Sequence, residues 1–450
     1  MELTAMDARA FAPSGERSIV VGAGVAGLLA ARSLARAGAS VTVLERADRI
    51  GGQLEAVSLA GVQVDIGAES FATRGDSVAA LLGELGLADR IEFPGQSGAW
   101  LVSDHGAAPL PPTALFGIPA GPMDAAVVAI IGLDAAERAS ADLTMAPVDA
   151  DAFHDLGALV TDRMGEVVLQ RLVDPVIRGV FSSSAREVSI DAAHPGLRGA
   201  LLATGSLSGA VARLRSNAPA GAAVASLRGT MVSIVDRLAT ELDALGVVVE
   251  TGVEVLAVDA GGVEVSRDGR RERITGRPIV AAPALASAAR RTREITVVAV
   301  AVDAPELDAA PRGTGALVVA GAAGITARAL THSSAKWPSI AAALPAGRHI
   351  LRLSYDVCPD DAASVAMADL AAILGCDPGV LVDLQIRTWV RTIEAGPSPG
   401  ISVVGEAASM TGLASIIAAS AINAATASSS SIVHSHGSVA SAVAPQEGTP

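Results

Sequence analysis

Short apolar runs and amphipathic segments alternate near the start of the chain, and this alternation predicts a βαβ unit. Residues 18–22 form a run rich in β-branched side chains, which is typical of a strand buried on both faces. Residues 28–37 are rich in Ala and Leu and end at Gly38, which suits a helix and its carboxyl end. A second short apolar run, 40–44, follows directly. Two parallel strands joined by a helix are therefore expected here.

The rest of the chain continues to alternate between apolar runs typical of strands and amphipathic segments typical of helices. Helices are predicted in several pieces over 123–180, and over 231–245, 283–291, 365–374 and 413–425. Strands are predicted over 247–250, 254–259, 263–266, 279–281, 295–302, 316–319, 349–355 and 401–405. Two segments with many small, polar, Gly or Pro residues, 95–122 and 204–225, are predicted to be irregular.

This pattern indicates an α/β (α+β two-domain) protein. We expect a Rossmann-like βαβ domain that is discontinuous in the sequence, built from 18–93, 226–291 and 400–425. A helical region over 94–225 and a strand-rich, mixed-sheet region over 292–399 would form the substrate side. Residues 1–17 and 428–450 are expected to be disordered, since the tail is too rich in Ser, Ala and Pro to bury a core.

Composition and charge narrow the function classes. The formal net charge is −14, which argues against a general nucleic-acid-binding protein. The two cysteines, Cys358 and Cys376, can form neither a disulfide framework nor a zinc site alone, and we expect both to be small buried residues. The first residues do not resemble a secretory signal, and no apolar run is long enough to span a membrane. A cytoplasmic protein is expected, with peripheral membrane contact left open.

The strongest chemical signal is the glycine motif at 22–27. Gly22 allows a tight turn, Gly24 lets a diphosphate approach the backbone, and Gly27 lets the helix pack closely on the strand. Glu45 ends the second strand, where its carboxylate can accept hydrogen bonds from ribose hydroxyls. A strand before the motif, a helix after it and an acid at this distance together favour a dinucleotide site over a simple tight turn.

Three weaker motifs follow, and for each one taken alone a structural turn is the favoured interpretation. They are Gly51-Gly52-Gln53 after the second strand, Gly67-Ala68-Glu69-Ser70, and Thr411-Gly412-Leu413 at the start of the last predicted helix. A helix that begins there could direct its positive end towards a reduced flavin.

Taken together, these motifs resemble the flavin-dependent amine oxidase and protoporphyrinogen oxidase superfamily. Within it, the chain is most similar to the actinobacterial coproporphyrinogen III oxidases, over about residues 18–425. Besides the glycine motifs, the resemblance is carried by the segments 67–71, 172–181, 226–231 and 329–337, the last of which contains Lys336-Trp337.

The resemblance implies a set of FAD contacts in this chain. Gly22, Ala23, Gly24, Val25, Ala26 and Gly27 would bind the diphosphate, and Glu45 and Arg46 the ribose. The remaining implied contacts are Gln53, Gly67, Ala68, Glu69, Ser70, Val253, Trp389, Thr411, Gly412 and Leu413.

The resemblance also implies an activity in haem biosynthesis. Coproporphyrinogen III would lose six electrons in three hydride transfers to flavin N5, and oxygen would accept the electrons and leave as hydrogen peroxide. Transfer of the product to a ferrochelatase is a further implication. Because the chemistry belongs to the flavin, no catalytic acid, base or metal is expected in the protein.

The substrate carries four propionates, so its pocket should offer cations. Arg74, Arg178 and Lys336 are the candidates, although each could be an ordinary surface charge. His332 is expected to be a structural, hydrogen-bonded histidine.

Two alternatives stay open. One is a protoporphyrinogen IX oxidase. The other is a flavin-binding paralogue with impaired catalysis, because the 390–400 segment is shorter than in related chains and Met410 stands where a glycine is common.

Overall fold

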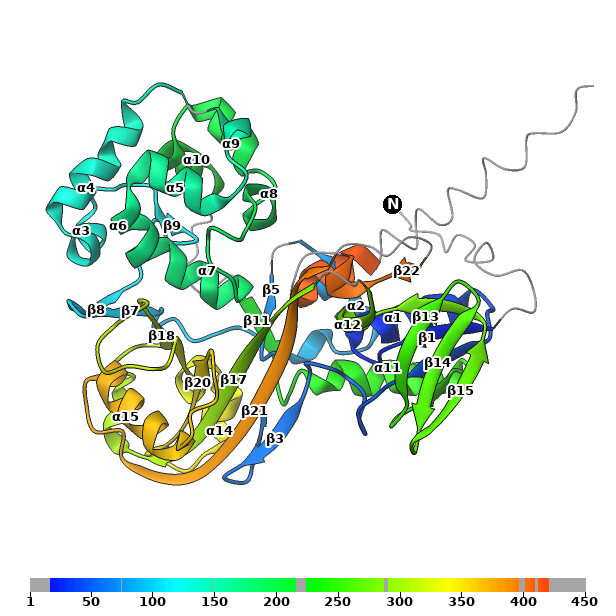
Figure 1. Ribbon diagram of the computed structural model, residues 1–450. Helices are drawn as coiled ribbons and strands as arrows, with labels where there is room; N and C mark the ends of the chain where they lie inside the picture. The colour runs from blue at the N-terminus through cyan, green and yellow to red at the C-terminus, as the bar shows by residue number, and fades with distance from the viewer. Residues whose placement is uncertain are drawn as a thin grey trace, which may run out of the picture.

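The computed structural model describes residues 17–73, 75–147, 149–215, 224–286, 290–395, 401–408 and 412–420. Within these residues the chain forms a parallel sheet with flanking helices, a larger mixed sheet, and a separate group of helices (Figure 1). The α/β class and the Rossmann-like βαβ start are confirmed.

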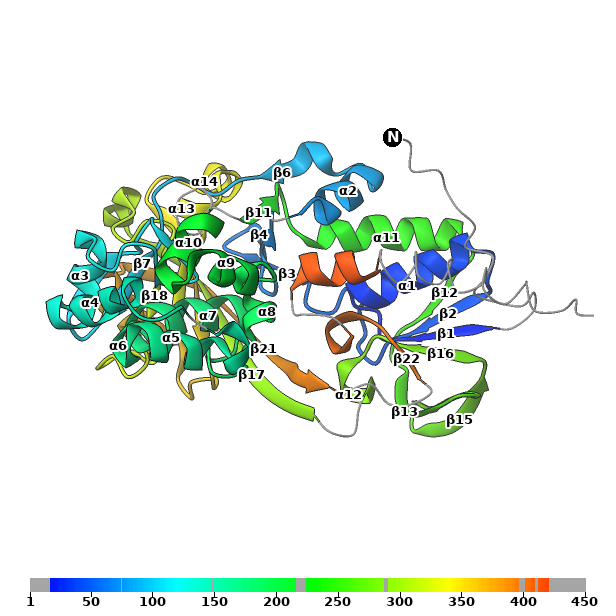
Figure 2. The ribbon, with the colours of Figure 1, turned by 90° about the horizontal axis from the view of Figure 1, so that it is seen from above.

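The parallel sheet joins segments from both ends of the described chain. All its strand pairs are parallel, and their spatial order is β12 (Val248–Glu250), β2 (Val41–Leu44), β1 (Ser18–Val21), β16 (Arg277–Val280) and β22 (Ser402–Val403). Helices α1 (Val25–Arg36) and α11 (Val232–Ala244) lie side by side over one face (Figure 2). The other face is covered by an antiparallel sheet of β13 (Glu254–Asp259), β14 (Gly262–Arg267) and β15 (Arg270–Thr275).

The two covered faces of β1 explain why three successive residues, 19–21, are all apolar. Val20 packs with α1 and α11, whereas Ile19 and Val21 pack against β13 and β14 on the opposite face. A strand covered on both sides loses the usual alternation of polar and apolar residues. The same holds in the mixed sheet, where Val298 and Val300 face one core and Val297 and Ala299 face another.

The large mixed sheet has strands from two distant parts of the chain. Its order is β21 (Val380–Ala395), β17 (Arg290–Asp303), β20 (Arg348–Tyr355), β19 (Ala329–His332), β18 (Gly315–Val318), β7 (Trp100–Ser103) and β8 (Gly106–Pro109). Helix α15 (Ala362–Leu374) packs on one face. The hairpin of β3 (Ala56–Leu59) and β4 (Val62–Asp65) packs on the other, next to α13 (Ser333–Lys336) and α14 (Pro338–Ala343).

The helical region encloses its own hydrophobic core. Its helices are α3 (Ala125–Ile131), α4 (Leu133–Ser140), α5 (Leu156–Met164), α6 (Glu166–Val168), α7 (Asp174–Phe181), α8 (Ile190–Ala193), α9 (Leu197–Thr204) and α10 (Leu207–Leu214), with a π-helical turn over Leu169–Val173.

Smaller elements connect these parts. They are the sheet of β5 (Phe71–Ala72), β11 (Val224–Leu227) and β6 (Ile91–Glu92), the pair β9 (Ala114–Leu115) and β10 (Ile118–Pro119), and the helices α2 (Ser77–Glu84) and α12 (Pro283–Ala286). Short 3-10 turns occur at Ala88–Arg90, Ala141–Leu143, Ala150–Ala152, Pro305–Ala309 and Gly405–Ala407.

Several sequence predictions differ from the structure. The predicted loop over 204–225 contains helix α10 and the start of β11. Helix α10 forms because the buried Asp142 carboxylate and the Ser206 hydroxyl accept hydrogen bonds from its first N–H groups. Of the predicted helix over 283–291, Pro283–Ala286 is helical and Arg290 already begins β17, whereas 287–289 lie outside the described residues. Cys358 is exposed, not buried.

The predicted domain boundaries stay predictions, with one structural addition. Strands β7 and β8 lie in the segment assigned to the helical region, yet they belong to the large mixed sheet. None of the helices that the structure describes has both the length and the apolarity needed to cross a bilayer.

Candidate functional site

The first glycine turn brings α1 directly against the end of β1. Gly22 has a φ of +99°, and a Cβ on Gly27 would lie 1.9 Å from the Gly22 carbonyl oxygen. Gly24 is the residue before α1, and no side chain among the described residues caps the amino end of this helix. The first N–H groups of α1 could therefore bind an anion, and their contact with a diphosphate stays a prediction.

The second glycine turn packs on the first. The Gly51 N–H donates to the Ala23 carbonyl at 2.8 Å, and a Cβ on Gly52 would lie 3.1 Å from the Gly24 Cα. Glycine is required because Gly51 and Gly52 have φ angles of +104° and +58°. The two motifs thus form one cradle of backbone atoms.

Arg49 fixes the second turn, and the sequence analysis gave it no role. Its guanidinium donates to the Gly52 carbonyl at 2.7 Å and to the buried carboxylate of Glu55 at 2.5 Å. It also lies 5.8 Å from the ring centre of Trp389. The available signal was an arginine two residues before a glycine pair, with Glu55 directly before the strand that follows.

Glu45 lies where the ribose contact was predicted, at the end of β2. Its carboxylate accepts hydrogen bonds from the N–H groups of Ala23 at 2.7 Å and Ala47 at 2.9 Å. The Val253 N–H donates to the Glu45 carbonyl at 2.9 Å, so these two predicted residues are neighbours. Arg46 follows with an exposed side chain.

The third motif meets Trp389 of β21. The Ala68 N–H donates to the Gln53 carbonyl at 2.9 Å. A Cβ on Gly67 would lie 2.0 Å from that carbonyl oxygen and 3.2 Å from the Trp389 ring. Gln53, Gly67, Ala68 and Trp389 are therefore brought together, and the half-buried Ser70 follows in the same segment.

The carboxyl-terminal motif also reaches this cradle. Strand β22 pairs with β16, and a Cβ on Gly405 would lie 2.7 Å from the Ala26 side chain of α1. Leu413 begins a helical segment, 413–420, that packs on the core of α1 and α11. Gly412 is exposed with a φ of +101°, whereas Thr411 and Met410 lie outside the described residues.

Glu69 holds an ion-pair network beside Gly67. Its two carboxylate oxygens pair with Lys336 Nζ at 2.7 Å and Arg352 Nη1 at 2.5 Å, and Arg352 also donates to the Gly67 carbonyl at 2.7 Å. Burial by itself raises the pKa of Glu69, but the two cations outweigh it and hold that pKa at about 2. Arg352 was missed by the sequence analysis, although a charge inside the apolar run 349–355 was a signal.

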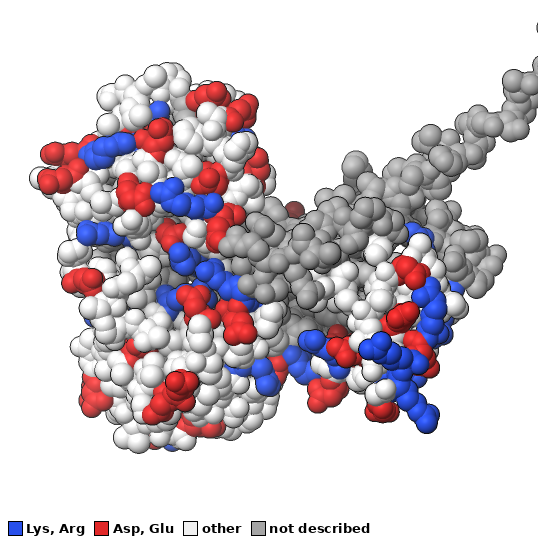
Figure 3. Space-filling view, in the orientation of Figure 1, with Lys and Arg blue, Asp and Glu red and all other residues white. Residues whose placement is uncertain are grey.

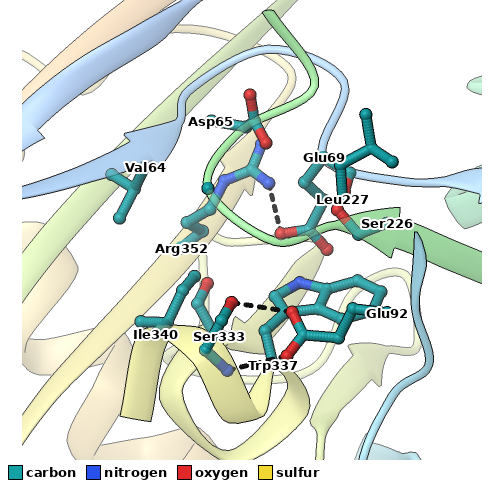
Figure 4. Close-up of a pocket in the computed structure, with 12 residues that line it drawn as sticks. Val64, Asp65, Glu69, Glu92, Ser226, Leu227, Ser333, Trp337, Ile340 and Arg352 are labelled. Atoms are coloured by element: carbon teal, nitrogen blue, oxygen red, sulfur yellow. Dashed lines mark hydrogen bonds and ion pairs between the residues drawn. The ribbon is translucent and has the colours of Figure 1, made fainter. Parts of the chain in front are cut away.

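Asp65 lies on the other side of Arg352. Figure 4 shows the two carboxylates around this guanidinium in a small pocket that Trp337 also lines. Burial raises the pKa of Asp65 to about 7, although the N–H of Met231 and the charge of Arg352 lower it. This carboxyl group therefore takes up a proton near neutral pH, unlike Glu69.

The predicted substrate cations have protein partners. Lys336 is engaged by Glu69 and contacts the Trp337 ring, and Arg178 pairs with Asp174 one turn earlier on α7 at 2.5 Å. Arg74 lies outside the described residues. Their role in substrate binding stays a prediction.

His332 is buried, and its ring hydrogen-bonds to the ring of a second buried histidine. It lies 3.1 Å from His349, and burial followed by repulsion from His349 lowers its pKa to about 4.

Three observations on the described residues fit an elongated dinucleotide such as FAD. The amino end of α1 is uncapped, the Gly24 and Gly52 backbones form a cradle that side chains would fill, and the buried Nε1 of Trp389 has no hydrogen-bond partner among the described residues. A polar atom left unpaired in this way is expected where a ligand supplies the partner.

Known proteins with similar sequences match most of the chain. The family model described as flavin containing amine oxidoreductase matches residues 25–320. A coproporphyrinogen III oxidase of Mycobacterium leprae (strain TN) is 32% identical and is matched over 84% of this chain and 88% of that protein. A coproporphyrinogen III oxidase of Propionibacterium freudenreichii subsp. freudenreichii is 28% identical, over 76% of this chain and 65% of that one.

Solved structures share the fold. A protein from Exiguobacterium sp. 255-15, assigned to the protoporphyrinogen oxidases, aligns with a TM-score of 0.76 and 21% identity over 93% of this chain and all of that one. The cyclohexylamine oxidase from Brevibacterium oxydans IH-35A aligns with a TM-score of 0.62 and 15% identity, over 93% of this chain and 99% of that one.

Proposed function

Because the chain belongs to the flavin containing amine oxidoreductase family and is an FAD-dependent oxidoreductase, we propose that it oxidises coproporphyrinogen III to coproporphyrin III in haem biosynthesis. The observation that carries this proposal is the extent of the match. Relatives that bear this activity in their name align along most of the chain, far beyond the glycine motif that many dinucleotide enzymes share.

The chain's own residues would hold and orient the cofactor. The free N–H groups at the start of α1 suit its diphosphate, and Glu45 suits its ribose hydroxyls. Trp389 and the Gly67 turn would border the ring system, with Gly405 and Leu413 closing the cradle. Bound FAD would supply the redox chemistry, three two-electron oxidations of the substrate with oxygen as the final electron acceptor and hydrogen peroxide as the by-product.

The proton balance of this reaction requires little from the protein. Each two-electron step removes one hydride from a methylene bridge and one proton. Of the three protons lost, two come from pyrrole nitrogens and one from the fourth bridge, and all three can pass to solvent. The buried histidines His332 and His349 hydrogen-bond to each other and are not needed as acid or base. Oxygen as acceptor, peroxide release, and hand-off of coproporphyrin to a ferrochelatase are parts of the proposal.

The test is a turnover assay on the purified yellow protein. Coproporphyrinogen III is added, and the growth of porphyrin fluorescence, oxygen uptake and peroxide are recorded, with protoporphyrinogen IX as the matched substrate. We expect faster turnover of coproporphyrinogen. Faster turnover of protoporphyrinogen would replace the substrate assignment.

A yellow protein without turnover of either porphyrinogen would support the impaired paralogue instead. The observation behind this second candidate is the short connection after Trp389. Strand β21 continues to Ala395, and β22 begins at Ser402, with 396–400 outside the described residues.

A further inference from the structure

Four arginines from different parts of the fold converge near the carboxyl end of α7. Arg178 lies in the last turn of α7, and Ser182 follows the helix. Arg293 of β17 donates to the Ser182 carbonyl, and Arg391 of β21 donates to the Ser182 hydroxyl at 2.9 Å. Arg293 and Arg391 are directly opposite each other in the register of the two strands.

Arg328 completes this group, which we call the arginine cluster. It precedes β19, and its Nε lies 3.3 Å from an Asp356 oxygen that Arg293 also approaches at 3.8 Å. Burial lowers the pKa of Arg328, and repulsion from Arg293 and Arg178 lowers it further, while Asp356 opposes the change. Arg328 is thus close enough to Arg293 and Arg178 for their positive charges to repel.

The carboxylates around the cluster do not satisfy it fully. Asp174 pairs with Arg178, and Glu406 pairs with Arg391 at 2.8 Å, so Arg293 and Arg328 share the half-exposed Asp356. Two buried donor atoms of Arg328, Nε and Nη1, make no hydrogen bond to any described residue. A guanidinium in this state suits an incoming carboxylate, which can accept two parallel hydrogen bonds.

The cluster also lies beside the cofactor cradle. Arg391 is two residues after Trp389 on β21, so the two side chains are on the same face of that strand. Its partner Glu406 follows Gly405, which touches Ala26 at the start of α1. On the face shown in Figure 3, basic and acidic side chains gather together between the helical region and the large mixed sheet.

We propose that Arg178, Arg293, Arg328 and Arg391 form the site that binds propionate carboxylates of the substrate and orients its macrocycle towards the flavin. This inference rests on the proposed function, and it adds Arg293, Arg328 and Arg391 to Arg178, one of the three cations that the sequence suggested. Cations at the junction of the helical region, the mixed sheet and the carboxyl-terminal segment would place the carboxylates while leaving the methylene bridges facing the cradle.

The test measures binding, separately from turnover. The FAD-loaded protein is titrated with coproporphyrin III, followed by fluorescence anisotropy, for the wild type, Arg293→Gln and Arg328→Gln. Each variant should bind about tenfold more weakly, because each loses a charge-assisted hydrogen bond to a carboxylate. Arg328→Lys should fall between Arg328→Gln and the wild type, since it keeps the charge but not the planar fork.

The matched control is Arg348→Gln. Arg348 is an arginine at the opposite end of β20, paired with Asp303 at 2.7 Å, and its loss should leave binding unchanged. Flavin absorbance and the melting temperature identify any variant that has lost its fold. In the wild type, added NaCl should weaken coproporphyrin binding, because salt screens the attraction between arginines and carboxylates. This salt dependence tests the proposal even if both glutamine variants unfold.

The outcomes separate the two proposals. Wild-type protein that neither binds coproporphyrin nor turns over coproporphyrinogen overturns the proposed function and, with it, the carboxylate site. The arginine cluster alone is overturned if the wild type turns over coproporphyrinogen but its coproporphyrin binding is insensitive to salt, and if folded Arg293→Gln and Arg328→Gln bind as tightly as the wild type.

Discussion

A single missing Cβ decides how closely α1 approaches the strand before it. Gly27→Ala would place a methyl group 1.9 Å from the Gly22 carbonyl oxygen, and backbone atoms cannot move aside as a flexible side chain can. We expect a loss of about 1–3 kcal/mol in the free energy of unfolding, as for other overpacked sites, together with a loss of bound flavin. Chemical denaturation and the flavin absorbance of the purified protein check both effects.

The matched substitution is Gly83→Ala in α2. A Cβ there would meet no heavy atom within 4 Å. Because alanine is the better residue inside a helix, this variant should keep its flavin and gain about 0.5–1 kcal/mol. Equal flavin content in both variants would contradict the role given to Gly27.

Glu69 provides a pH-dependent test, also at the residue scale. Glu69→Gln leaves Lys336 and Arg352 without their shared carboxylate, which should cost about 3–5 kcal/mol near neutral pH. The folded-state pKa of Glu69 is lowered to about 2, so its contribution is complete above the unfolded value of about 4.3 and is lost as the pH falls towards 2. The stability difference between wild type and Glu69→Gln should therefore shrink on acidification.

Denaturant titrations at a series of pH values measure that difference. Glu137→Gln, on the exposed surface of α4, is the control and should change stability little at any pH. If the stability difference between the wild type and Glu69→Gln stays constant between pH 5 and about 2, the ion pairs do not set the pKa of Glu69.

At the scale of elements, α10 depends on one buried carboxylate. Asp142 is fully buried, accepts hydrogen bonds from the N–H groups of Leu207 and Ser208 at 3.0 and 2.7 Å, and pairs with Arg163 at 2.7 Å. It lies far away in the sequence, so the pattern of 204–225 alone, rich in Gly, Ser and Ala, indicated a loop.

Asp142→Ala should therefore destabilise the helical region by about 3–5 kcal/mol, because it leaves Arg163 buried without a counter-charge. Limited proteolysis should cut this variant within 204–215 before the parallel sheet is attacked. Asp134→Ala, at an exposed position of α4, serves as the comparison. Identical cleavage patterns for the two variants would argue against this account of α10.

At the scale of the whole molecule, the cofactor cradle needs both ends of the described chain. Gly405 has a φ of +80° and touches Ala26. Gly405→Val would clash with α1 and strain the backbone, and we expect FAD to bind about tenfold or more weakly, from an overpacking cost of 1–3 kcal/mol. Equilibrium titration of the apoprotein with FAD measures this.

The control lies three residues further on. Ala408→Val alters an exposed position and should leave the FAD affinity as it is. Circular dichroism should be preserved in both variants, which shows that the fold is kept. Unchanged FAD affinity in Gly405→Val would mean that the carboxyl-terminal segment does not close the cradle.

Much of the fold was predictable because its signals are local. The buried strands β1 and β2, the helix between them and the glycine turn follow from residue spacing within a short segment, where backbone sterics and burial act directly. The resemblance to flavoenzymes added the remote turns. The predicted loop at 204–225 failed because a residue outside that segment satisfies the helix that forms there.

The sequence by itself determined the βαβ unit, the places where glycine is required and the supply of cations for a carboxylate-bearing substrate. Only the tertiary structure decided which charges meet: Lys336 finds Glu69 at a separation of 267 residues, and Arg178 joins arginines of β17 and β21. The physical reason is the distance along the chain between the residues that interact. Periodicity reflects neighbours within one element, whereas a charge pair between elements depends on how the sheets and helices pack.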